Sequence, residues 1–146
     1  EADDAIGIFA TANPGNVVVS PDKDMKQIAG KLYDLETSKD ITAEEGARWH
    51  LIQTLAGDQT DGYSGVPGIG VKRAGTLFNK EGYSWSTVVK AFEDKGLTET
   101  DALTNARLAR ILTIDDYDTK RQEPKLWTPE STYEVNSGTG LQDESD

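Results

Sequence analysis

The sequence predicts an α/β fold, with a partial parallel sheet followed by a helical subdomain. Residues 17–19 are three successive valines, and a continuous β-branched run is typical of a parallel strand buried on both faces. Asp22 and Asp24 follow this run directly, at the position where open parallel sheets bind their ligands. A glycine-rich turn at residues 65–70 then leads into helical hydrophobic spacing alone, which continues to about residue 113.

The first element expected is a helix over residues 1–10. Its apolar residues recur at helical spacing and are Ala2, Ala5, Ile6 and Phe9. A turn at residues 13–16 leads into the strand. Thr42 and Glu45 form a capping-box pattern, which predicts a helix running from there to about residue 56. The residues of this helix expected to face inward are Trp49, Ile52 and Leu55.

Three more helices are expected after the glycine-rich turn. The first covers about residues 71–79, the second begins at Ser84 or Ser86 and ends before Gly96, and the third runs from Thr98 to about residue 113. Their expected apolar positions are Val88, Val89 and Phe92 in the second, and Ala102, Ala106, Ala109 and Leu112 in the third. Leu126 and Trp127 are expected to pack back on the body.

Length and composition restrict the class of protein. The 146 residues suffice for one modest domain with a hydrophobic core. No apolar run approaches the length of a membrane span and no secretory signal is visible, so we expect no membrane partner. Because the sequence has no cysteine, disulfides and thiolate metal sites are excluded. This composition fits a reducing compartment, and we expect a cytoplasmic protein.

The formal net charge of −11 argues against a nucleic-acid binder, which normally presents a basic surface. The acidic residues are concentrated in two regions, however. One is a tail after residue 129 that contains no Lys or Arg. The other is a set of three short motifs, whose acidic members are Glu1, Asp3, Asp4, Asp22, Asp24, Asp58 and Asp61. Because bound cations would offset the charge of the motifs, the acidity does not exclude DNA.

The carboxylates of these motifs suit a hard divalent cation, since Mg²⁺ prefers oxygen ligands and retains water molecules. Asp58 and Asp61 are three residues apart. Glu1 and Asp4 are one helical turn apart and can share a face. Asp3 points elsewhere on a regular helix, so we expect it to act through a second metal or by supporting another ligand. The alternative is that acids at a helix start simply interact favourably with the helix dipole.

The glycine-rich turn has the composition of a phosphate-binding site. Glycines let successive N–H groups point outward, and a helix N-terminus after them attracts anions. Lys72 and Arg73 add positive charge where a phosphate would bind. Metal carboxylates beside such a turn indicate cleavage of a nucleic-acid backbone. The alternatives are an ordinary turn between helices and, for Lys72 and Arg73, a solvated helix face.

Residues 57–74 resemble the helix-hairpin-helix (H3TH) region of the flap endonuclease and 5′→3′ exonuclease family, and they match its Gly-Val-Pro-Gly-Ile-Gly-x-Lys pattern with the two aspartates before it. Residues 1–4 resemble the acidic helix start of that family, and residues 20–24 resemble its Ser-x-Asp-x-Asp segment after a strand. Further similarity, to the short exonucleases of lytic podophages, lies at residues 49–54, 106–112 and 126–129. The resemblance covers about residues 1–129.

The resemblance implies a PIN-like nuclease core with two divalent ions, Mg²⁺ or Mn²⁺. The metal ligands that it implies are Glu1, Asp3, Asp4, Asp22, Asp24, Asp58 and Asp61, of which Asp22, Asp24, Asp58 and Asp61 are the implied catalytic residues. The implied DNA-binding residues are Gly65, Val66, Gly68, Ile69, Gly70, Lys72 and Arg73. Backbone oxygens near Ser64, Val66 and Ile69 are implied to hold a monovalent ion, usually K⁺. Such DNA binding would be largely independent of sequence, since phosphates carry no base identity.

The same resemblance implies an N-terminal nuclease half that this sequence does not show, with another strand-end aspartate, a further metal carboxylate and a basic helical arch. We therefore expect residues 1–56 to be the C-terminal part of the nuclease core and residues 57–114 to be the DNA-binding subdomain. Residues 115–146 are expected to form an extension, disordered after about residue 130. A separate chain that carries the N-terminal half is an expected partner.

The expected function is that of a metal-dependent 5′→3′ exonuclease or flap endonuclease acting on 5′ ends, flaps and duplex DNA, in the host cytoplasm if phage-encoded. The alternatives are a structure-specific DNA-binding module without activity and an acidic interaction protein with degenerate motifs. His50, the only histidine, is expected to be packed or exposed rather than catalytic. Tyr63 could stack on a base or pack in the core. Further candidates for phosphate contact are Lys80, Arg107 and Arg110.

Overall fold

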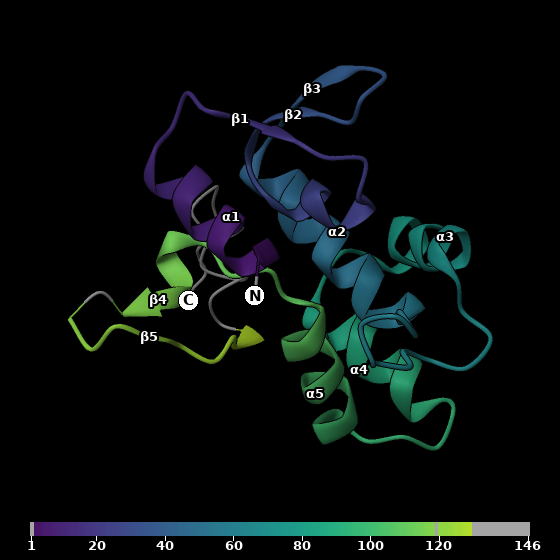
Figure 1. Cartoon of the computed structure of the whole chain (residues 1–146). Helices are drawn as coiled ribbons and strands as arrows, with labels where there is room; N and C mark the ends of the chain where they lie inside the picture. Colours follow the sequence, from purple (N-terminus) through teal and green to yellow (C-terminus); the bar gives the residue numbers. More distant parts are fainter. Residues whose placement is uncertain (1, 119, 130–146) are drawn as a thin grey trace, which may run out of the picture. The chain divides into compact units, whose positions relative to one another are not determined.

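The computed structural model describes residues 2–118 and 120–129, and Figure 1 shows its helices and strands in chain order. Glu1 and the tail after residue 129, where disorder was expected, lie outside the described residues. The chain divides into two compact units. The first unit contains the residues up to Ala47 together with Arg110–Trp127. The second unit contains Arg48–Ala109 and, of the remaining described residues, those after Trp127. This division differs from the expected succession of segments, because the chain returns to the first unit after the second.

The first unit contains a three-stranded sheet. After helix α1 (Ala2–Ala12) come strand β1 (Val17–Val19), the 3₁₀ helix η1 (Lys23–Gln27), and strands β2 (Gly30–Tyr33) and β3 (Ser38–Ile41). The strand order is β1-β2-β3, with β1 parallel and β3 antiparallel to β2. The expected parallel pairing of residues 17–19 is confirmed. The hairpin of β2 and β3 was not expected, because its strands are short and mostly polar.

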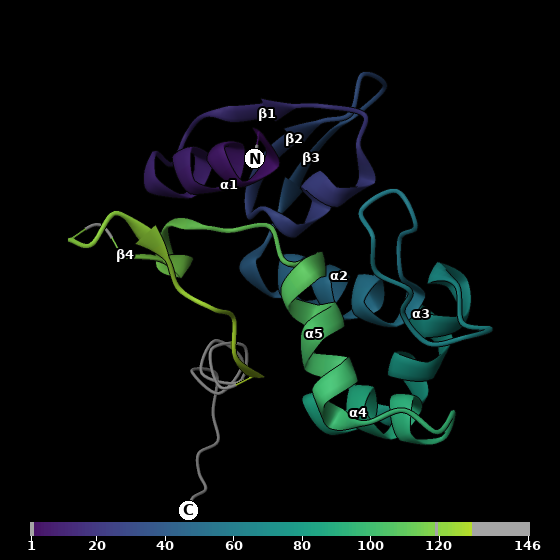
Figure 2. The same ribbon diagram turned by 60° about the horizontal axis from the view of Figure 1, so that its bottom comes forward.

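The core of the first unit lies on one face of this sheet. Its buried members are Val18, Met25, Ile28, Leu32 and Ile111, with Ala10 of α1 and Ile41 of β3 packed against them. Figures 1 and 2 show α1 alongside β1. Val17 is 48% exposed and Val19 is 60% exposed. The expectation that the valine run is buried on both faces is therefore wrong, because the described part of the chain covers only the face that Val18 occupies.

The turn between β2 and β3 is held by Asp34. Its carboxylate accepts hydrogen bonds from the backbone N–H groups of Thr37 at 2.8 Å and Glu36 at 3.0 Å. These two bonds, helped by Lys39, hold the pKa of Asp34 below its ordinary value. The turn thereby orients β3, which leads directly into the next helix.

The segment after residue 109 completes the first unit. Helix α5 (Glu99–Ala109) ends four residues earlier than expected. Asp116 terminates it, since its carboxylate binds the Arg110 guanidinium at 2.7 Å and the Thr113 N–H at 2.9 Å. The 3₁₀ helix η2 (Ile114–Asp116) and the short strands β4 (Tyr117–Asp118) and β5 (Glu123–Pro124) follow. Trp127 is buried, which confirms that it packs back, whereas Leu126 is exposed.

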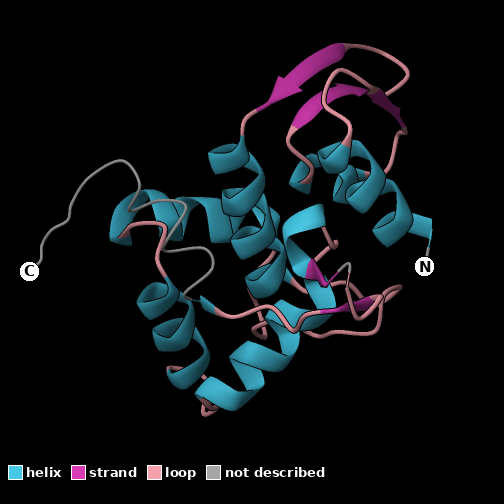
Figure 3. Ribbon diagram, turned by 90° about the vertical axis from the view of Figure 1, so that its left-hand side faces the viewer, coloured by secondary structure: helices cyan, strands magenta, loops and turns pink. Residues whose placement is uncertain are grey.

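The second unit is helical, and Figure 3 draws the helices of both units in cyan. It contains most of α2 (Ala43–Ala56), then α3 (Val71–Glu81), α4 (Trp85–Glu93) and α5. The capping box of α2 is confirmed by reciprocal bonds between Thr42 and Glu45, at 2.9 and 3.0 Å. The fully buried apolar side chains of this unit include Leu55, Val66, Phe78, Val88 and Phe92.

The helix predictions differ from the structure in two further details. Leu55 faces inward as expected, but Trp49 and Ile52 are only half-buried. Helix α4 begins after the Ser84 cap, as expected, whereas α3 extends two residues beyond the expected end. In the described ranges no helix combines the length and the apolar character needed to cross a membrane.

Candidate functional site: an acidic cluster and an open glycine turn

The segment after β1 turns sharply and presents two carboxylates. The Ser20 hydroxyl accepts a hydrogen bond from the Asp22 N–H at 3.1 Å. The Asp22 carboxylate in turn accepts from the Asp24 N–H at 2.9 Å and so caps the start of η1. Local backbone bonds of this kind explain why a Ser-x-Asp-x-Asp sequence folds into a compact acidic turn.

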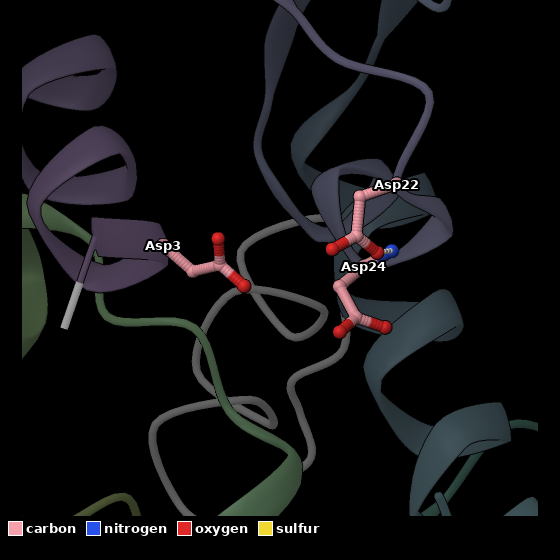
Figure 4. A group of neighbouring side chains, drawn as sticks. All are labelled: Asp3, Asp22 and Asp24. Atoms are coloured by element: carbon pink, nitrogen blue, oxygen red, sulfur yellow. Dashed lines mark hydrogen bonds between the residues drawn. The ribbon is translucent and has the colours of Figure 1, made fainter. Parts of the chain in front are cut away.

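Asp3 on α1 faces these two residues from the opposite side, as Figure 4 shows. Asp3, Asp22 and Asp24 each offer one carboxylate oxygen, and the three oxygens lie within 4.8 Å of one another. Asp24 is only 7% exposed, Asp3 is half-buried and Asp22 is exposed. Three carboxylate oxygens that converge in this way form a donor set that fits a hard divalent cation.

The electrostatics of this acidic cluster also favour a cation. Lys23 brings its ammonium to 3.9 Å from an Asp24 oxygen, but this is a long contact and the lysine is half-exposed. Like charges so close together repel one another. A divalent ion bound by Asp3, Asp22 and Asp24 would relieve this repulsion.

The sequence-predicted ligands do not all meet at this cluster. Asp4 lies on the same helical turn as Asp3, yet its Oδ1 accepts a hydrogen bond from the Leu112 N–H at 3.1 Å. Adjacent residues of a helix point in directions about 100° apart, so Asp3 and Asp4 face different neighbours. This arrangement is the reverse of the expectation from the sequence, in which Asp4 shares a face with Glu1 and Asp3 points elsewhere. Glu1 lies outside the described residues.

Asp58 and Asp61 lie in the second unit, in the loop after α2. The backbones of Asp58 and Tyr63 pair through bonds of 2.7 and 3.1 Å. The Asp58 carboxylate accepts from the Thr60 N–H at 2.9 Å, whereas Asp61 is exposed. Tyr63 is 4% exposed, so it packs in the core, which settles the alternative of stacking on a base.

The base of the glycine turn is locked against the helices of this unit. The Val66 N–H donates to the Leu55 carbonyl at 2.8 Å, and the Gly65 N–H donates to the Asn105 carboxamide at 2.9 Å. Gly65 has φ +63°, and a Cβ there would lie 2.4 Å from the Leu55 oxygen. The role of Asn105 could not be predicted from the sequence. A polar residue between apolar helix positions gives no local signal of a hydrogen-bond partner 40 residues away.

The tip of the turn is open. The Ile69 N–H bonds the Val66 carbonyl at 3.1 Å, with Pro67 and Gly68 between them and Gly68 at φ +82°, as in a type II turn. A Cβ on Gly68 or Gly70 would meet nothing within 4 Å. Gly70 caps α3 without a side chain, and the first N–H groups of any helix lack intrahelical partners. This tip therefore has the geometry of an anion site.

The basic side chains singled out from the sequence differ in what they do. Lys72 and Arg73 are exposed on the first turn of α3, and Arg73 donates to the Gly68 carbonyl at 3.2 Å. Arg110 is instead paired with Asp116 in the first unit. His50 is fully buried, with Nε2 2.8 Å from the Ala106 carbonyl oxygen, which confirms that it is packed.

The described residues thus form a mixed α/β unit whose converging carboxylates could hold a divalent cation, and a helical unit with an open glycine turn. No family model matches the chain. It is 31% identical to the exodeoxyribonuclease of Enterobacteria phage T3 in an alignment 170 residues long, gaps included. This alignment covers 90% of this chain and 56% of the relative. It is 30% identical to the exonuclease of Escherichia phage T7, over 88% of this chain and 56% of the relative.

A 5′-3′ exonuclease of Mycobacterium tuberculosis is 30% identical over 75% of this chain and 42% of the relative. The resemblance to the 5′→3′ exonuclease family is thereby confirmed over three quarters or more of this chain. It spans about half the length of the phage relatives that it matches, 56% in each case.

Proposed function

We propose that this chain is part of a metal-dependent 5′→3′ exonuclease or flap endonuclease that hydrolyses DNA phosphodiesters. The observation that carries the proposal is the convergence of Asp3 with Asp22 and Asp24, which follow β1: one carboxylate oxygen of each lies within 4.8 Å of the others. The similarity of the chain to exonucleases supports the same proposal. Carboxylate oxygens are appropriate ligands for Mg²⁺ or Mn²⁺. Two such ions, when bound, would neutralise the phosphate and lower the pKa of a coordinated water.

Each carboxylate has its own part in this proposal. Asp22 and Asp24 hold metal directly, with the acidic turn after β1 keeping them in place. Asp3 completes the set from α1. Asp58 and Asp61 are proposed as further ligands, and the bond from Thr60 to Asp58 would orient that carboxylate.

Residues 57–114 are proposed as a helix-hairpin-helix subdomain that grips duplex DNA. The N–H groups of Gly68 and Gly70 would contact a backbone phosphate, with Lys72 and Arg73 adding charge. The carbonyls of Ser64, Val66 and Ile69 would hold K⁺. The open space beside Gly68 and Gly70 supports this proposal, and so do the positive φ and the exposure of Gly68. Binding would depend on salt and little on sequence.

The proposed partner of this chain is the remainder of the nuclease core, on the same or another polypeptide. Parallel strands are normally covered on both faces. In the described sheet β1 is an edge strand, and Val17, Val19 and Tyr33 expose apolar surface beside it. The length of the relatives supports the same proposal. For the chain by itself, the exposed edge of the described sheet favours the second candidate function, a DNA-binding module that does not cleave.

A nuclease assay separates the two candidates. The chain is incubated with 5′-flapped and nicked duplexes in Mg²⁺, Mn²⁺ or chelator, with and without the part of the T7 relative that this chain does not cover. We expect DNA binding alone, and chelator-sensitive cleavage after the addition. Asp24→Ala should abolish the restored cleavage, while Glu93→Ala, a substitution at an exposed position of α4, should not. Absence of both binding and cleavage in every mixture would contradict the proposal.

A further inference from the structure

Residues 110–114, here called the strap, are held to the rest of the first unit by side-chain oxygens. Every backbone N–H from residue 111 to residue 114 donates to one. The acceptors are Gln27 for Ile111 at 2.9 Å, Asp4 for Leu112 at 3.1 Å, Asp116 for Thr113 at 2.9 Å and Thr11 for Ile114 at 2.8 Å. The strap therefore has its backbone position fixed along its whole length.

Helix α1 contacts the strap through a polar face. Asp4, Gly7 and Thr11 lie three and four residues apart, so they share one side of the helix. A Cβ on Gly7 would lie 2.1 Å from the Leu112 carbonyl oxygen, which shows how closely the backbones approach. Of the residues expected on its apolar face, Ile6 is 38% exposed and Phe9 is 60% exposed. The rotation of α1 thus depends on hydrogen bonds and close packing, not on an apolar stripe.

The same strap reaches both elements that carry the acidic cluster. Asp4 and Thr11 attach α1, the helix of Asp3. Gln27, the last residue of η1, attaches the element that begins after Asp22 and contains Asp24. The separation between Asp3 and the two strand-end aspartates is therefore set by two groups of bonds to one segment.

We propose that Asp4 is a positioning residue and not a metal ligand. Its bond to Leu112 fixes the rotation of the first turn of α1, and this rotation turns Asp3 toward Asp22 and Asp24. The inference rests on the proposed metal site, but it assigns Asp4 a role different from that of its three acidic neighbours. Without the Asp4 carboxylate, the Leu112 N–H loses its acceptor and the first turn of α1 is released.

Mn²⁺ binding to the full chain, measured without DNA by the electron paramagnetic resonance of free Mn²⁺, tests this role. Asp4→Asn keeps an oxygen that can accept from Leu112 but removes the charge, so affinity should remain within about twofold. Asp4→Ala removes the acceptor, and loss of a group that orients a ligand typically weakens metal binding by about tenfold or more. Asp22→Asn serves as the reference for a lost ligand.

Thr11→Val is the matched control, because it removes another bond between α1 and the strap, two turns away from Asp3. It should lower the melting temperature as Asp4→Ala does, yet leave Mn²⁺ affinity unchanged. Equal loss of affinity in both variants would reduce Asp4 to a general stabiliser and overturn the proposal. Loss of affinity in Asp4→Asn as large as in Asp22→Asn would make Asp4 a ligand, with the same consequence.

Hydrogen exchange of the Leu112 amide in the unaltered chain keeps the test decisive if Asp4→Ala does not fold. Protection that persists at saturating Mg²⁺ supports a bond to Asp4 in the metal-bound protein, and protection lost on adding Mg²⁺ overturns it. The Asp22→Asn arm reports on the metal site itself. Unchanged affinity there would defeat the proposed function, whereas the Asp4 arms decide only the positioning role.

Discussion

Substitution of Gly70 by alanine should separate DNA binding from folding. Gly70 has φ −97° and ψ −173°, a conformation open to any residue, and an added Cβ would meet no atom within 4 Å. The methyl group would instead stand among the N–H groups that we propose to contact a phosphate. Loss of one hydrogen bond to a charged group costs about 1.5–3 kcal/mol, which corresponds to a roughly 10- to 150-fold higher Kd for DNA.

The same substitution should change stability little, because two effects oppose each other. Replacing glycine by alanine at a permitted conformation stabilises a protein by about 0.4–1 kcal/mol, through the entropy of the unfolded chain. Alanine is a poorer helix N-cap than glycine, and the difference is of order 0.5–1 kcal/mol. We therefore expect the melting temperature of Gly70→Ala to stay within about 5 °C of the original.

Gly65→Ala is the contrasting control in the same turn. Its Cβ would lie 2.4 Å from the Leu55 oxygen at φ +63°, so the turn must shift and the protein should lose stability. The assay is fluorescence anisotropy with a labelled 5′-flap DNA and two duplexes of unrelated sequence, in chelator, at two salt concentrations. Unchanged Kd for Gly70→Ala, or a loss confined to one duplex sequence, would refute the phosphate contact.

Three further predictions concern the first unit. Millimolar Mg²⁺ should raise the melting temperature by binding the folded acidic cluster, and Asp22→Asn should reduce that rise; equal rises in both proteins would count against the site. Asp34, whose pKa is lowered by the Thr37 and Glu36 amides, contributes stability above its unfolded pKa, and this contribution disappears as pH falls through the lower folded pKa. Asp34→Asn, which keeps an acceptor in the turn, should flatten this part of the acid dependence in urea unfolding, and an unchanged dependence would show that other carboxylates cause it. Asp116→Ala leaves the Arg110 guanidinium, 16% exposed, without its carboxylate and should cost about 3 kcal/mol of unfolding free energy, against less than 1 kcal/mol for Asp115→Ala at an exposed site.

Local signals in the sequence predicted the elements whose stabilising contacts are themselves local. The Thr42–Glu45 capping box and the Ser84 cap connect residues three apart, and both are observed. The type II turn at Pro67 and Gly68 likewise follows from the conformations that these two residue types prefer. In each case the deciding contact lies within a few residues.

Contacts between distant residues produced the differences. Apolar spacing favoured a helix through Leu112, but the Leu112 N–H bonds Asp4, 108 residues away, in an extended segment. The orientation of α1 could not be predicted either, because Gly7 and not Phe9 occupies the buried side. An apolar periodicity identifies a helix face, yet it cannot say whether a polar face has better partners elsewhere in the chain.

The strap also determines when the acidic cluster can form during synthesis. Asp4, Thr11 and Gln27 leave the ribosome long before the amides that they bind, the separations being 108, 103 and 84 residues. At roughly 5–20 residues per second, this delay lasts several seconds or more. The second unit is made in that interval and has its own core, so we expect it to fold first. A nascent chain that stops at Ala109 would carry every aspartate of the three acidic motifs without the segment that holds α1 and η1 at their working separation.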